Sequence, residues 1–457
     1  MKYISNKIII FAGLISVSLM NFSCQKDAFD KANENPNAPS SGSIVPANVL
    51  PAVENGIAYT QGGDITRYAT LFVQQSVGFS RQASAYYNYV LTSTDFDSPW
   101  GNMYTSALGN NKDLMTRSDE RGDNAYGGIS RVLMAYSLQL LVDSWGDVPY
   151  SQALKGDANT HPSYDQAAAL YDTIHSLTDV AIAKLSNTSG DAQSPGSDDI
   201  IYGGDTDKWI KFAHAIKARL YIHQSKGNAA MAQKALDEAN LSFTSNADNA
   251  QYLYGTEETN ANPIYQFNEQ RGDIDYASGA LPTILISKTD PRTDMIIDTT
   301  YGDVNAVGIG AYYGSINSPV EFITYEEIEF IKAEATLRTT GDIAAAQVFF
   351  QKGIKASMDK LGVSSTDAAA YIAANGTLPL TVADAIAAVA VQEYISLANN
   401  PEAWTLWRRT ASPTLVPVAG TNGIPRRFLY SQNAYSLNKA NVPAGVTLFA
   451  PKIFWDN

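Results

Sequence analysis

Residues 324–356 read TYEEIEFIKAEATLRTTGDIAAAQVFFQKGIKA, and this stretch decides the fold. Thr324 and Glu327 match a T-x-x-E capping box, in which each side chain satisfies a backbone amide at the start of a helix. Apolar residues then follow at three- and four-residue steps, namely Ile328, Ile331, Ala335 and Leu337. Gly341 is the predicted helix end, and Asp342 is the predicted cap of a second helix. The second helix runs through Val348, Phe349 and Ile354. Because few residues join the two helices, we expect an antiparallel helical hairpin.

Similar helical periods recur along the chain and predict further helices. They lie at 129–144, 167–185, 209–223, 229–239 and 381–397. Pairs of amphipathic helices suggest tetratricopeptide-like stacking, although no literal repeat of about 34 residues is present. The intervening stretches are rich in Gly, Asn, Asp and Tyr and lie at 76–95, 186–207, 255–280 and 298–320. The predicted fold is mostly α, with tetratricopeptide-like hairpins as a scaffold, a loop-rich region and a few short strands.

The N-terminus has the pattern of an export signal. Two lysines precede an uncharged run at 8–20, which is too short for a membrane-spanning helix of about 20 residues. Ser23 and Cys24 follow, and this only cysteine has no disulfide partner, so the pattern resembles a bacterial lipoprotein signal with an acylated Cys24. Asn21 stands where that pattern usually has an aliphatic residue, and an ordinary cleaved signal stays open. The expected parts are a signal at 1–23, a lipidated leader at 24–43 and one domain at 44–457.

Charge and composition exclude some partners. The net charge of −14 argues against nucleic acid and anionic lipid, because both need clustered Lys and Arg. The chain has 26 tyrosines and six tryptophans but only 17% charged residues, which suits neutral, ring-shaped ligands. We expect most of these rings to lie in the core all the same.

Sequence signals for catalysis are absent. The four histidines show no H-E-x-x-H spacing, and there is no G-x-S-x-G elbow or Walker loop. His214 and His223 are expected to be packing groups. The carboxylates at 326–334 are better explained by helix capping and by pairing of Glu329 with Lys332 than by a glycosidase pair. The acidic residues at 198–207 lack EF-hand spacing and are expected in a solvated turn. We therefore expect no enzyme, no cofactor and no metal.

Five stretches, taken in order, resemble the SusD/RagB family of outer-membrane nutrient-binding lipoproteins. They are Asn35-Pro36-Asn37; Trp145-Gly146-Asp147-Val148-Pro149-Tyr150; Tyr202-Gly203-Gly204-Asp205 with Trp209-Ile210-Lys211-Phe212; the 325–335 helix; and Glu402-Ala403-Trp404 with Trp407-Arg408-Arg409. Two positions depart from similar members, because Glu393 and Ala434 stand where those often carry a lysine and an acid.

The resemblance implies a surface lipoprotein, held in the outer membrane by the lipid on Cys24 and facing outward. It implies that the protein captures a nutrient and delivers it to a TonB-dependent, SusC-like transporter. The expected ligand is an oligosaccharide or polysaccharide. Two alternatives stay open: a peptide-binding member of the same family, and a tetratricopeptide-type scaffold that binds only proteins.

Sugar recognition needs flat rings against pyranose faces, with amide and guanidinium groups for the hydroxyls. Candidate ligand-binding residues of these types lie in the predicted loops: Arg81, Tyr86, Tyr87, Asn88, Tyr89, Tyr276, Tyr312 and Tyr313. Trp100 and Tyr104, on a predicted helix, are expected in the core.

Overall fold

The predicted hairpin is formed by helices α16 (Tyr325–Thr340) and α17 (Ile343–Lys360). Gly341 ends α16 in the left-handed conformation, with φ of 70°. Asp342 caps α17 by accepting the Ala345 N–H at 2.9 Å. The capping box at Thr324 is wrong, because Thr324 makes no side-chain cap bond. Its predicted partner Glu327 turns inward, and the first N–H of α16 is instead donated to the Asn249 side chain.

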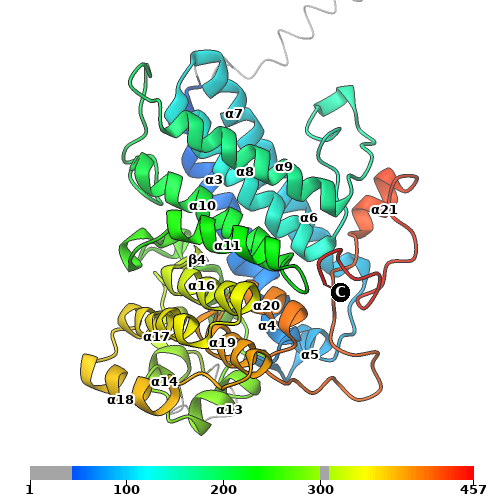
Figure 1. Ribbon diagram of the computed structural model, residues 1–457. Coiled ribbons are helices and arrows are strands. Elements are labelled where there is room, and N and C mark those ends of the chain that lie inside the picture. Colours follow the sequence, from blue (N-terminus) through cyan, green and yellow to red (C-terminus); the bar gives the residue numbers. More distant parts are fainter. Residues whose placement is uncertain (1–43, 299–307, 457) are drawn as a thin grey trace, which may run out of the picture. The chain divides into compact units, whose positions relative to one another are not determined.

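The protein is described by a computed structural model over residues 44–298 and 308–456 (Figure 1). The remaining α-helices are α3 (Pro46–Thr60), α4 (Thr66–Phe72), α5 (Arg81–Tyr87), α6 (Asp97–Asn102), α7 (Asn110–Arg121), α8 (Asn124–Trp145), α9 (Ala167–Leu185), α10 (Thr206–His223), α11 (Ala229–Leu241), α12 (Pro263–Gln270), α13 (Ala280–Ser287), α14 (Thr293–Ile296), α15 (Ala311–Gly314), α18 (Ser365–Asn375), α19 (Val382–Ser396), α20 (Glu402–Thr410) and α21 (Gln432–Asn438). Helix α9 begins and ends at the predicted residues. The mostly α prediction is confirmed.

The few short strands form two antiparallel pairs. Strand β1 (Val77–Gly78) pairs with β3 (Ile274–Asp275), and β2 (Ala250–Tyr252) pairs with β4 (Val320–Ile323). Each pair joins segments that are far apart in the sequence, and the β1–β3 pair ties the loop-rich stretches at 76–95 and 255–280 to one another.

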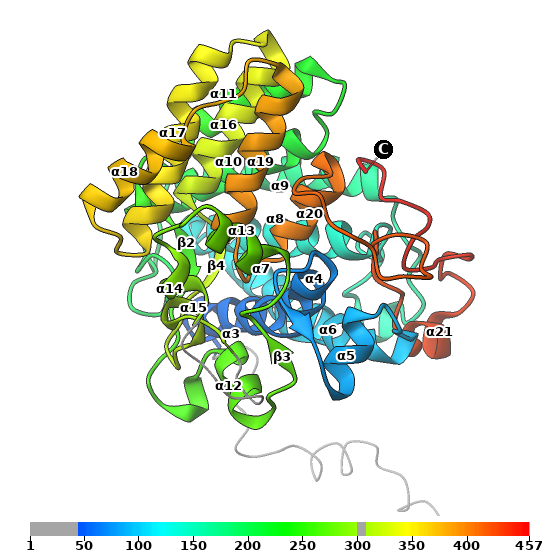
Figure 2. The same ribbon diagram turned by 90° about the horizontal axis from the view of Figure 1, so that it is seen from below.

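Residues Pro46–Asn457 form one compact unit. Within it, α8, α9, α10, α11, α16 and α17 pack in succession, each against the next, as tetratricopeptide-like stacking requires (Figure 1). Helices α5, α6 and α12 lie with β3 in the region of short helices and loops (Figure 2). None of the helices in the described ranges is long and apolar enough to cross a membrane. The predicted signal, Cys24 and the Asn35-Pro36-Asn37 leader lie outside the described residues.

The motif that follows α8 is structural. Gly146 has φ of 82° and ψ of −121°, and the Arg427 guanidinium lies where a side chain at Gly146 would point. Asp147 accepts the first N–H of α9, that of Ala167, at 2.8 Å. The Trp145 indole donates to the Leu429 carbonyl at 2.9 Å. This turn therefore fixes α8, α9 and the C-terminal segment to one another.

The acidic stretch before α10 is an anchor for the backbone. Asp199 is 3% exposed, so the expectation of a solvated turn is wrong for this residue. Its carboxylate accepts the N–H groups of Ile201, Tyr202 and Gly204 and the indole N–H of Trp209 at 2.7 to 3.1 Å. By accepting these hydrogen bonds, the carboxylate holds the turn at Gly203 and Gly204 against α10.

Candidate functional site

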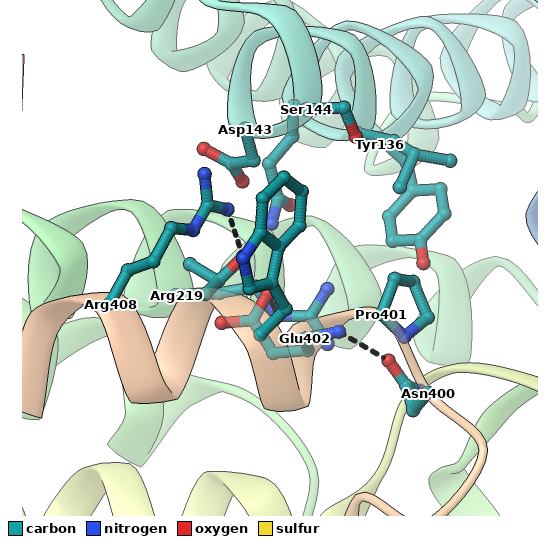
Figure 3. Close-up of a pocket in the computed structure, with 12 residues that line it drawn as sticks. Tyr136, Asp143, Ser144, Arg219, Asn400, Pro401, Glu402 and Arg408 are labelled. Carbon is teal, nitrogen blue, oxygen red and sulfur yellow. Dashed lines mark hydrogen bonds and ion pairs between the residues drawn. The ribbon is translucent and has the colours of Figure 1, made fainter. Parts of the chain in front are cut away.

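A buried ionic cluster joins the helical stack to α20 (Figure 3). Arg219 on α10 donates to both carboxylate oxygens of Glu327 on α16, at 2.6 Å each. Its Nε also lies 3.7 Å from Glu402 on α20. His223 contacts Glu402 at 2.8 Å through Nε2 and the Tyr171 hydroxyl at 2.9 Å through Nδ1. The predicted packing role of His223 is confirmed by its complete burial.

This cluster is not suited to a ligand or a cation. Its cavity has a volume of about 20 Å³, which is room for about one water molecule. Asp143, His223 and Glu402 place potential metal ligands within 4.8 Å of one another. Burial lowers the pKa of His223 to about 3, so the ring is neutral at pH 7. The guanidinium of Arg219 already supplies the positive charge, and a second cation would be repelled by it.

A similar ion pair holds α20 to the hairpin. Glu334 on α16 is completely buried and accepts from Arg409 on α20 and from Arg338, the latter at 2.6 Å. Burial acts to raise the pKa of Glu334, but the two guanidinium groups outweigh it and hold the pKa at about 2. The Glu329–Lys332 pair predicted from the sequence is confirmed at 2.8 Å.

A solvent-facing cavity of about 570 Å³ lies beside α12, and we call it the α12 cavity. Its lining includes Phe79, Ser80 and Arg81 at the start of α5, Tyr265, Asn268 and Glu269 on α12, and Gly272, Asp273, Gly308, Ile309 and Gly314. Asn262 caps α12 by accepting the Ile264 N–H at 2.8 Å, and Pro263 opens the helix. The three α12 residues are spaced three and four positions apart, which places their side chains on one face.

The α12 cavity combines an apolar ring with charged and polar groups. Phe79 is 44% exposed, which is high for an aromatic side chain. Asp273 is 1% exposed, and its Oδ1 lies 3.3 Å from the Arg81 guanidinium. Within the described ranges, its Oδ2 accepts no hydrogen bond. This oxygen has almost no exposed surface, so Asp273 acts on the cavity by holding the Arg81 guanidinium, whose side chain is 67% exposed and free to meet a ligand hydroxyl.

Of the candidate residues, Arg81 lines this cavity, whereas four of the tyrosines are core residues. Tyr86, Tyr89, Tyr276 and Tyr313 are only 5 to 7% exposed, so their rings cannot stack on a ligand in this conformation. Tyr86, for example, lies edge-on to Tyr68 with ring centroids 4.8 Å apart. The 81–87 stretch, read as loop, is helix α5, and that helix turns the Tyr86 ring inward.

The other candidates are partly engaged in the protein. Tyr87 and Tyr312 are half-buried, and the Tyr312 hydroxyl donates to Glu321 at 2.9 Å. The Asn88 amide donates to the Ser84 carbonyl at 2.7 Å. Sequence reasoning missed Phe79, the α12 face and Asp273. The Asn-Pro start at 262–263 and the helical spacing after it were the available signals.

Comparison with known proteins identifies the fold family. A family model described as SusD-like, "Starch-binding associating with outer membrane", matches residues 36–431. The chain belongs to the SusD-like family. A SusD/RagB family protein from Bacteroides thetaiotaomicron matches with a TM-score of 0.74 and 24% identity, over 91% of this chain and 99% of its own. A chitin-binding SusD homologue from Flavobacterium johnsoniae matches with a TM-score of 0.72 and 21% identity, over 90% and 97%. No curated protein matches in sequence.

These SusD-like structures share the fold of this chain, and identities of this size say nothing about its ligand. The SusD/RagB resemblance read from the sequence is confirmed by the family match. The α12 cavity, rather than the buried cluster, is the candidate ligand site of this SusD-like protein, because it alone of the two is open to solvent and large enough for a small ligand.

Proposed function

We propose that this protein binds an oligosaccharide or polysaccharide in the α12 cavity and delivers it to a SusC-like transporter. The observation that carries the proposal is the exposed Phe79 ring in the same cavity as the exposed Arg81 guanidinium, which the buried Asp273 carboxylate holds at 3.3 Å. A flat apolar ring stacks on the apolar face of a pyranose, and a guanidinium donates hydrogen bonds to its hydroxyls. The protein binds and releases its ligand without turnover.

The family description also supports the cellular setting of the proposal. Because SusD-like proteins are described as associating with the outer membrane, Cys24 is proposed to carry the lipid that anchors the chain there, facing outward. A Cys24→Ala variant should then leave the outer-membrane fraction. If that variant still fractionates with the outer membrane, the anchor assignment is wrong.

Affinity electrophoresis tests the ligand class. The full chain carrying Cys24→Ala is run through gels containing soluble starch or glycol chitin, the two classes named for relatives. We expect one of them to retard the protein. Arg81→Ala should weaken that binding by roughly 10- to 150-fold, the equivalent of a charged hydrogen bond worth about 1.5 to 3 kcal/mol. Phe79→Ala should also weaken it.

Val90→Ala is the matched control, because Val90 is 67% exposed and does not line the cavity. Retardation that is equal in Arg81→Ala, Phe79→Ala and the parent would overturn the α12 site. If neither polysaccharide nor any sugar on a glycan array binds, and peptides do, the peptide-binding alternative replaces this proposal. Co-purification with a barrel transporter and no soluble ligand would favour the protein-binding scaffold.

A further inference from the structure

A second cavity of about 290 Å³ lies between α6, the 149–164 loop and α21, and we call it the aromatic cavity. It shares no lining residue with the α12 cavity. Trp100, Tyr104 and Tyr164 form its walls. Trp100 is only 9% exposed, as expected of a core residue, yet its ring borders open space.

The walls are held in place by hydrogen bonds between separate segments. The Tyr104 hydroxyl donates to the Pro149 carbonyl at 2.8 Å. The Asn438 amide donates to the Pro162 carbonyl at 2.8 Å, which joins α21 to the loop. The Asn433 N–H donates to Asp97 at 3.0 Å, which joins α21 to α6. The cavity is therefore formed before any ligand arrives, and binding needs little reordering.

The shape and chemistry of the walls favour a flat ring. The Trp100 and Tyr164 rings are 19° from parallel with centroids 6.2 Å apart, too close for a third ring to enter between them, and Tyr104 lies 4.9 Å from Trp100, so an aromatic ligand packs beside this cluster of rings. The Trp100 indole N–H makes no hydrogen bond to any residue in the described ranges, so it can donate to a ligand. The remaining wall is mostly apolar and would leave the hydroxyls of a sugar ring without partners.

The mouth of the aromatic cavity has two unusual leucines. Leu437 is 71% exposed on α21. Leu154 has a φ of 59°, a left-handed conformation that bulky residues seldom adopt. Strained residues of this kind concentrate at ligand-binding positions, and an exposed leucine gains most when a ligand covers it.

We propose that the aromatic cavity is a second ligand site, which takes a planar aromatic ring bearing a hydrogen-bond acceptor, such as an aryl amide or aryl ester. The ring packs beside the Trp100 and Tyr164 rings, and the acceptor receives the indole N–H. Leu154 and Leu437 close over the ring edge. This site acts independently of glycan binding in the α12 cavity.

Ligand-observed NMR titration of the full chain carrying Cys24→Ala tests this proposal with three probes. Benzamide has the flat ring and the acceptor, cyclohexanecarboxamide has the acceptor on a puckered ring, and methyl glucoside is a sugar ring. We expect benzamide to bind at least tenfold more tightly than either of the others. Ala153→Phe, which fills the cavity, and Leu437→Asp, which places a charge at its mouth, should each weaken benzamide binding at least tenfold.

Leu241→Asp is the matched control, because Leu241 is 60% exposed on α11 and does not line the cavity. Circular dichroism and thermal melting establish that each variant is folded. Benzamide binding that is absent in the parent, or unchanged in both cavity variants, would overturn the site. Tighter binding of methyl glucoside than of benzamide would overturn the ligand class.

Discussion

Replacement of Glu54 by glutamine should stabilise the protein at neutral pH. Glu54 on α3 is completely buried, and its Oε2 accepts the Ile200 N–H at 2.8 Å. No N–H or O–H of the described residues reaches its Oε1. Burial, followed by repulsion from Asp199, raises the pKa of Glu54 well above its ordinary value of 4.5. The carboxyl therefore keeps its proton in the folded state, and that proton can be donated to Asp199.

The sign and size of the effect follow from proton binding. Between the unfolded pKa near 4.5 and the higher folded pKa, the folded protein holds a proton that the unfolded chain releases. Stability therefore falls as pH rises through this interval, by about 1.4 kcal/mol for each pH unit. The side-chain amide of the Glu54→Gln variant is neutral at every pH and can donate the same hydrogen bond to Asp199. The free energy of unfolding of Glu54→Gln should be only slightly higher than that of the parent at pH 4.5. The difference should then grow by about 1.4 kcal/mol for each unit that the pH rises.

Urea denaturation of the parent and of Glu54→Gln at pH 4.5, 5.5 and 6.5 measures the difference directly. The exposed Glu258→Gln serves as the control for loss of one negative charge. If the difference in the free energy of unfolding between Glu54→Gln and the parent is the same at all three pH values, the reasoning is refuted. A Glu258→Gln difference of the same slope would also refute it.

Four further variants test the hairpin. Gly353→Ala should destabilise the protein by about 1 to 3 kcal/mol in urea denaturation, because a Cβ there would lie 2.7 Å from the Phe330 ring. Asp342→Ala should lower the free energy of unfolding by about 1 kcal/mol, because α17 loses its cap. Thr324→Val removes a hydroxyl that caps nothing and should cost less. Equal costs for the two variants would contradict the cap assignment. Glu334→Gln should cost about 3 to 5 kcal/mol at pH 7, because the buried Arg409 and the half-buried Arg338 guanidinium groups lose their carboxylate. Since the pKa of Glu334 is about 2, that cost should shrink as pH falls below about 4.5, and a cost that is constant down to pH 2 would contradict it.

The scaffold was predictable from the sequence because helical periods and end signals act within a few residues. Gly341 and Asp342 end one helix and begin the next as their residue types require. Thr324 was misread for a non-local reason. Its partner Glu327 is drawn away by Arg219, which lies 108 positions earlier in the chain. A capping box read from spacing alone cannot account for such a competitor.

The candidate site was less predictable, because the exposure of a ring depends on distant segments. Tyr89 lies in a stretch that reads as loop, but it packs against Phe72 and Phe449. Composition cannot distinguish such a ring from the exposed Phe79 nearby. The role of Asp273 could not be predicted either. Its carboxylate belongs to the site only because the fold brings it beside Arg81, nearly two hundred positions away in the chain.

The links from the C-terminal segment to α8 bear on how the protein tolerates truncation. The Trp455 indole donates to Asp143 at 3.1 Å across 312 positions, and the Phe428 N–H donates to the Ser144 carbonyl at 2.8 Å. A chain cut before residue 428 would lack both donors. Its α8 end and the charges beneath it would then be open to water, and proteases could attack them. A chain truncated before residue 428 should therefore be less stable and more quickly cleaved by proteases than the whole molecule.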